Sequence, residues 1–167
     1  MTRRSKREIE RDLEEFTEQR TGAKDYTPAV KEKYPDEVVE VIYRVARDVM
    51  RVCHRNPDTV VNAPTEEATA AFLDEVREQY GIADDRDADV RAGLDEAAAN
   101  AGSKYWTPID AFETAVIAVP GEMDLETDDG VTLSELIEAG DETAAERLLV
   151  QRTYEALAGL GQGVSAR

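Results

Sequence analysis

Apolar residues in this chain recur every three or four positions, and this spacing constrains the fold more than any other feature. A period of 3.6 residues is typical of amphipathic helices, whereas a half-buried strand alternates apolar and polar residues with a period of two. No convincing run of the second kind occurs, because Val60 and Val61 are too brief to count. The sequence therefore predicts an all-α fold, an irregular bundle of six to seven helices with a long central helix near 35–55.

Residues that start or stop helices place the expected boundaries. Residues 21–34 are expected to form a loop because Pro28 interrupts them, and Pro120 is expected to stop the fifth helix. Thr132 and Glu135 form a capping box before a short helix. The expected helices cover about 6–20, 35–55, 65–80, 88–101, 108–119, 133–139 and 142–159.

These boundaries divide the chain into three parts. Residues 1–34 would hold an N-terminal helix and a tether, which together could form an arm that docks on a partner. Residues 35–160 would form the helical domain. Residues 161–167, with the sequence GQGVSAR, are expected to be a flexible tail.

The charge of the chain is strongly negative. It carries 20 Lys and Arg against 37 Asp and Glu, a net charge of −17, and 15 of the 20 basic residues are arginines. Abundant acids, scarce lysine and 6% aromatic residues resemble the composition of proteins from extreme halophiles. At about 1 M salt the Debye length falls to ~3 Å, so the excess charges barely repel one another. The alternative is an acidic protein that mimics nucleic acid or binds a basic partner.

The charge is unevenly distributed along the chain. Residues 1–55 carry 13 basic and 12 acidic side chains, a net of +1, whereas residues 56–167 carry 7 basic and 25 acidic side chains, a net of −18. Charge asymmetry between parts of a chain often marks a contact surface. We therefore expect the N-terminal third to meet a partner.

The helix near 35–55 carries an arginine stripe opposite a wide apolar face. One interpretation is a solvated surface in which nearby acids pair with the arginines. The other is a docking surface for an acidic protein or for phosphates, although high salt weakens phosphate contacts. The four residues of the arginine stripe are Arg44, Arg47, Arg51 and Arg55.

Two further features are candidates for partner contact. The first expected helix has a narrow apolar stripe of Ile9, Leu13 and Phe16, which must dock either on its own domain or on a neighbouring subunit. Trp106 stands just before the fifth helix, where it is either a core anchor or an interface hot spot.

The residue types that carry common catalytic chemistry are nearly missing. Cys53 and His54 are the single cysteine and the single histidine, and adjacent helical side chains point about 100° apart. They cannot complete a zinc site or readily form a nucleophile–base pair. Two acidic stretches that begin at Asp85 and Asp124 faintly resemble EF-hand loops, but neither has a glycine at the sixth position. No metal, cofactor or catalytic residue is therefore predicted.

These observations predict a non-enzymatic structural or adaptor subunit of a multiprotein assembly in a high-salt environment. A neck or ring component of the virion of a virus of a halophile would fit, in a homo- or hetero-oligomer. The alternative is a small nucleic-acid-associated regulator that uses the basic N-terminal tail and the arginine stripe. The longest apolar run, 115–119, is far too short to span a membrane, and no secretory signal is recognised. A cytoplasmic or virion location is expected.

Overall fold

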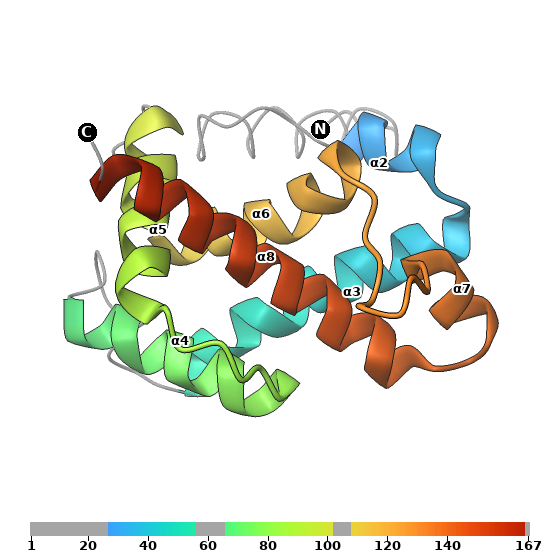
Figure 1. Ribbon diagram of the computed structural model, residues 1–167, viewed down its shortest axis with the longest axis horizontal. Helices are drawn as coiled ribbons and strands as arrows, with labels where there is room; N and C mark the ends of the chain where they lie inside the picture. Colours follow the sequence, from blue (N-terminus) through green and yellow to red (C-terminus); the bar gives the residue numbers. More distant parts are fainter. Residues whose placement is uncertain (1–26, 56–65, 102–107, 166–167) are drawn as a thin grey trace, which may run out of the picture.

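The structure is a computed structural model that describes residues 27–55, 66–101 and 108–165. These residues form helices that cross one another in an irregular bundle (Figure 1), and they contain no β-strand beyond one isolated bridge between Glu126 and Thr132. The all-α prediction is confirmed. The described helices are α2 (Thr27–Lys33), α3 (Asp36–Arg55), α4 (Glu66–Tyr80), α5 (Asp87–Ala101), α6 (Pro108–Glu122), α7 (Leu133–Glu138) and α8 (Glu142–Ser165).

Helices α3, α4, α5 and α7 begin and end close to their predicted boundaries. The start of α7 shows why: the Thr132 hydroxyl accepts a hydrogen bond from the Glu135 N–H at 3.1 Å, as a capping box requires. Gly140, with a φ of 78°, follows the end of α7 in the left-handed conformation that glycine adopts without strain. Local capping chemistry fixes this short helix.

The long helix α3 is central, as predicted, but it shares that position with α8. Helix α3 packs against α2, α4, α6, α7 and α8, and α8 packs against every described helix from α3 to α7. The apolar face of α3 is fully enclosed, since Ile42, Val45 and Val49 have no exposed surface. Two long helices, rather than one, therefore organise the core.

The first difference from the prediction is α2, which forms where a loop was expected. Pro28 lies in the first turn of α2. The backbone N–H groups of a first turn have no partner within the helix, so the N–H that proline lacks costs no hydrogen bond there. Val30 is fully buried in the core. Lys33 Nζ and the Tyr34 hydroxyl both donate to the Pro120 carbonyl, at 3.0 and 2.7 Å. Residues 27–34 therefore belong to the bundle and not to a tether.

The second difference is that α6 continues through Pro120 to Glu122. A proline removes one backbone donor but keeps its carbonyl, which here accepts hydrogen bonds from Lys33, the last residue of α2, and from Tyr34, which follows it. The Met123 N–H still donates to the Val119 carbonyl at 3.0 Å. The proline therefore does not stop the helix where the sequence predicted.

The third difference is at the end of α8, which extends to Ser165 where a flexible tail from 161 was expected. Helix α8 crosses α5 (Figure 1), and this is the most extensive helix pairing in the described residues. A Cβ placed on Gly161 would lie 1.7 Å from the Asp89 carbonyl oxygen, and one on Gly93 would lie 2.0 Å from the Leu157 carbonyl oxygen. The two backbones touch at this point, which we call the glycine crossing (Gly93 and Gly161). Only glycine fits there.

Aliphatic side chains dominate the core, as the low aromatic content requires. Phe72 of α4 and Phe112 of α6 meet edge to face, with ring centroids 5.7 Å apart and an interplanar angle of 83°. Other large side chains that are almost completely buried come from six helices. They include Val30, Val38, Ile42, Leu73, Leu94, Leu149 and Tyr154, together with Leu133 at the start of α7.

The glycine crossing predicts opposite effects for glycine-to-alanine substitutions within α5 and α8. Gly93→Ala or Gly161→Ala forces the backbones apart and should lower the free energy of unfolding by about 3 kcal/mol, the upper range for overpacking. Gly159→Ala and Gly163→Ala are matched controls, because a Cβ at either position meets nothing within 4 Å. Each control should instead raise stability by about 0.5–1 kcal/mol through helix propensity.

Denaturant unfolding of the four variants in molar KCl measures these differences. Equal stability of the Gly161→Ala and Gly163→Ala variants would show that the backbones do not touch at Gly161.

Candidate partner-docking surface

Arg44 lies on the side of α3 that faces α8. Its guanidinium binds Glu146 at 2.9 Å and Glu142 at 3.3 Å, both from the first turns of α8. These two acids lie 98 and 102 positions from Arg44 along the chain. Arg44 therefore ties two helices together, and its charge is already compensated.

The remaining described arginines of the stripe face outward. Arg51 is 72% exposed and binds Asp48, one turn earlier on α3, at 3.3 Å. Arg47 is also exposed, and no carboxylate of the described residues forms an ion pair with it. Arg55 lies in the last turn of α3, and its side chain is outside the described part of the structure.

A shallow hollow of about 380 Å³ lies beside the arginine stripe, between α3, α7 and the start of α8. Five of its seven lining residues are charged, Val41 is buried and Ile137 is half-buried. We call it the α3 hollow. Its lining residues are Glu37, Glu40, Val41, Arg44, Arg47, Ile137 and Glu142.

The structure thus brings together two of the eight sequence-predicted contact residues, Arg44 and Arg47, and places Arg51 one turn further along the same helix. Four others fall outside the described residues, so their predicted contacts remain predictions. These are Ile9, Leu13, Phe16 and Trp106.

A second hollow, of about 440 Å³, lies between α4, α5 and the start of α6. Arg91 crosses it to bind Glu66 at 2.9 Å, which joins α5 to α4. Two of the three charged residues on its walls, Arg91 and Glu66, therefore already pair across helices. Its other lining residues are Thr69, Ala88, Ala92, Asp95 and Pro108.

Sequence reasoning missed a polar cluster at the junction of α4, α5 and α8. The hydroxyl of Tyr154, whose side chain is fully buried, donates to Asp87, and Arg77 binds the same carboxylate at 2.8 Å. Burial and this hydrogen bond raise the pKa of Tyr154 well above its ordinary value, so the phenol keeps its proton as donor. The cluster joins residues that are 67 positions apart. Spacing along one helix could not reveal it.

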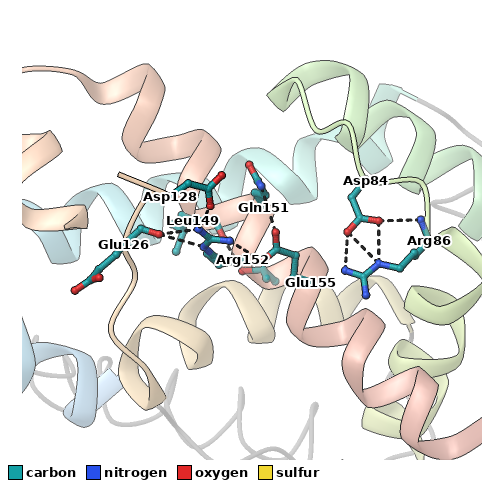
Figure 2. Close-up of polar contacts among 9 residues, drawn as sticks. Asp84, Arg86, Glu126, Asp128, Leu149, Gln151, Arg152 and Glu155 are labelled. Carbon is teal, nitrogen blue, oxygen red and sulfur yellow. Dashed lines mark hydrogen bonds and ion pairs between the residues drawn. The ribbon is translucent and has the colours of Figure 1, made fainter. Parts of the chain in front are cut away.

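Figure 2 shows two further ion-pair groups beside α8. Arg152 donates to the Glu126 carbonyl and binds Asp128 and Glu155, which holds the loop before α7 against α8. In the loop before α5, the Asp84 carboxylate accepts hydrogen bonds from two side-chain nitrogens of Arg86.

The Asp84–Arg86 pair has a consequence for pH dependence. The hydrogen bonds from Arg86 hold the pKa of Asp84 below its ordinary value. A carboxyl whose pKa is lower in the folded state stabilises the fold above its unfolded pKa. This contribution is lost as the pH falls through the folded pKa.

The acidic stretches that resemble EF-hand loops are used in other ways. Asp87 lies in the first turn of α5 and accepts the hydrogen bond from the Tyr154 hydroxyl. Asp124 binds Lys33 at 3.0 Å, and Asp128 binds Arg152. Among the described residues, no three His, Cys, Asp or Glu side chains are grouped so that they could hold a metal ion. In the same residues, no helix combines the length and the apolar character that a membrane span requires.

Exposed carboxylates are spread over every element from α4 to α8 rather than gathered on one of them. Large apolar side chains are rarely exposed: in the described residues only Met123, at 46%, and Leu160, at 38%, stand out. The described surface therefore offers charge far more than apolar contact. The exposed acids include Glu66, Glu67, Asp74, Glu78, Asp95, Glu122, Asp129, Glu135, Glu138 and Glu142.

Comparison of the chain with protein-family models, with curated proteins and with solved structures found no match.

Arg44 and Arg51 are expected to contribute differently to the free energy of unfolding. Arg44→Ala removes a link between α3 and α8 and should lower the free energy of unfolding by about 1 kcal/mol, the upper value for a partly exposed ion pair. Arg51→Ala should change it by less than ~0.5 kcal/mol, because its single pair lies within one helix and it also repels its arginine neighbours. Denaturant titrations of both variants test this. A larger loss for Arg51→Ala than for Arg44→Ala would contradict the assignment.

Proposed function

We propose that this chain is a non-enzymatic structural or adaptor subunit of a multiprotein assembly that works in a high-salt environment. A neck or ring component of the virion of a virus of a halophile is the specific role that fits. The observation that carries the proposal is the exposure of Arg47 and Arg51 on α3, beside the α3 hollow. Arg47 forms no ion pair with a carboxylate of the described residues, and Arg51 is 72% exposed although it binds Asp48 one turn earlier.

The high-salt part of the proposal is supported by the surplus of acids. Residues 56–167 carry 25 acidic side chains against 7 basic ones. Four of those basic residues are bound in ion pairs, namely Arg77, Arg86, Arg91 and Arg152. Most of the acids therefore have no cation to neutralise them, and in dilute buffer their repulsion strains the compact state. Exposed acids on every element from α4 to α8 favour general hydration over mimicry of one nucleic-acid surface.

The assembly part is supported by the way the polar groups are used. Ion pairs such as Arg44–Glu146 and Arg77–Asp87 join different helices, so these charged side chains stabilise the fold. The α3 hollow adds a surface that combines Val41 and Ile137 with two arginines and three glutamates, and arginine is enriched where proteins contact one another.

The alternative, a nucleic-acid-associated regulator, gains no support from the described residues. Phosphate contact through the arginine stripe would compete with Glu142 and Glu146 for Arg44. Molar salt further removes the counterion release that drives such binding. The stripe is therefore better suited to a protein partner.

Light scattering and thermal unfolding of the full chain at about 0.1 M and about 1 M KCl test the proposal. We expect a higher melting temperature and a defined oligomer, or a stoichiometric complex identified by mass spectrometry of the co-purifying chains, at the higher salt. A monomer that binds no protein stoichiometrically and melts at the same temperature in both buffers would contradict it. Salt-sensitive retention on DNA would favour the regulator instead.

A further inference from the structure

The loop between α6 and α7 holds two adjacent residues whose side chain and backbone can react with each other. They are Asp129 and Gly130, which form the only Asp–Gly pair of the chain, and the chain has no Asn–Gly pair. Every other aspartate and asparagine is followed by a residue with a side chain. Because glycine has no Cβ, the nitrogen of Gly130 is the least crowded backbone nitrogen that follows an aspartate in this chain.

The pair belongs to a short hairpin turn, residues 127–131, which we call the Asp–Gly turn. The Thr127 N–H donates to the Val131 carbonyl at 2.8 Å, which closes a loop formed by residues 128–130. Gly130 has a φ of 84°, the left-handed conformation that is typical of the last position of such three-residue hairpin loops. The backbone of the turn is therefore defined by glycine at the position that the reaction also favours.

The carboxyl group of Asp129 is accessible and is not held by another side chain. Asp129 is exposed, and no lysine or arginine of the described residues forms an ion pair with it. Its neighbour Asp128 differs in this respect, because it binds Arg152 at 3.3 Å (Figure 2). The space around Gly130 is open, since a Cβ placed there would meet nothing within 4 Å. The carboxyl group of Asp129 can therefore turn toward the backbone nitrogen of Gly130.

We propose that Asp129–Gly130 is a modification site at which aspartate converts to isoaspartate without an enzyme. A bond forms between the Gly130 nitrogen and Cγ of the protonated Asp129 carboxyl group, the Cγ–OH bond breaks, and the hydroxyl leaves with the amide proton as one water. The product is a cyclic imide. Water that adds to its main-chain carbonyl carbon breaks the bond from that carbon to nitrogen and gives isoaspartate, whereas addition at Cγ restores aspartate. This inference does not depend on the proposed function.

Opening of the Asp–Gly turn controls how often the reaction starts. The Gly130 N–H donates to the Thr127 carbonyl at 2.9 Å, so this hydrogen bond must break before the nitrogen attacks. The Thr127 hydroxyl stabilises the closed turn, because it accepts a hydrogen bond from the Val131 N–H at 3.1 Å. Exposed loops open locally at a lower free energy than the core unfolds. The reaction therefore proceeds in the folded chain, at a rate that the turn sets.

Isoaspartate at position 129 changes how this loop is held against α8. The backbone then runs through Cγ, which adds one carbon atom to the main chain inside the Asp–Gly turn. The turn is closed by backbone hydrogen bonds of 2.8 and 2.9 Å, and a longer loop cannot keep both in the same geometry. Asp128 and the Glu126 carbonyl, which bind Arg152 at 3.3 and 2.8 Å, lie directly before the altered residue. The modification therefore weakens the contact between the loop and α8.

Peptide mapping of the full chain, kept folded in molar KCl below its melting temperature, tests the inference. Isoaspartate separates from aspartate by chromatography at unchanged mass, and the imide is detected by the loss of one water. Isoaspartate should accumulate at Asp129 at least about tenfold faster than at Asp128, because only Asp129 precedes a residue without a side chain. Asp128 is the matched control, since it is exposed in the same loop. The modified chain should melt about 3 °C lower, the shift expected when a surface contact is lost.

Two variants test the chemistry and the role of the turn. Asp129→Glu keeps the charge but would have to form a larger ring, so the product at this position should be lost. Thr127→Ala removes the hydroxyl that stabilises the closed turn and should speed the reaction about fivefold, the effect of one lost hydrogen bond. A sample unfolded in guanidinium chloride gives the rate of the open chain. Isoaspartate at 129 in the unfolded sample but not in the folded one, or equal amounts at 128 and 129, would overturn the inference.

Discussion

The bundle depends on one close contact, the glycine crossing between α5 and α8. The two backbones touch at Gly93 and Gly161, where any side chain would collide with a carbonyl group of the other helix. This approach brings Tyr154 within reach of Asp87 and packs Leu157 and Ala158 of α8 into the core. Because α8 packs against all described helices from α3 to α7, a shift at the crossing is transmitted to the whole bundle.

The packing of the helices determines how the charged side chains pair. Arginines at helix junctions bind carboxylates of neighbouring elements, as Arg44 does with α8 and Arg152 with the loop before α7. Acids outnumber these cations and remain exposed on the surface. Arg47 and Arg51 of α3 are exposed beside the α3 hollow, and this is the face that we propose for assembly.

Local chemistry made much of the fold predictable from the sequence. The apolar face of α3 and the capping box at Thr132 depend on neighbours within one helix turn, so spacing alone located them. Contacts between distant segments could not be read in this way: Arg44 and Glu146 are 102 positions apart. The glycines near the end of α8 led to the prediction of a flexible tail. In sequence, a glycine that permits close packing cannot be distinguished from one that ends a helix. Of the candidate surface, the arginine stripe was predictable, but the α7 and α8 walls of the hollow were not.

Amide hydrogen exchange in molar KCl tests whether the contact between α5 and α8 holds the bundle together. We expect the amides around Gly93 and those around Gly161 to exchange slowly and together, through the same global opening that exposes the core of α3. Rapid exchange of α8 beyond Leu157, while α5 remains protected, would contradict it. In that event the end of α8 is frayed, and contacts other than the glycine crossing stabilise the bundle.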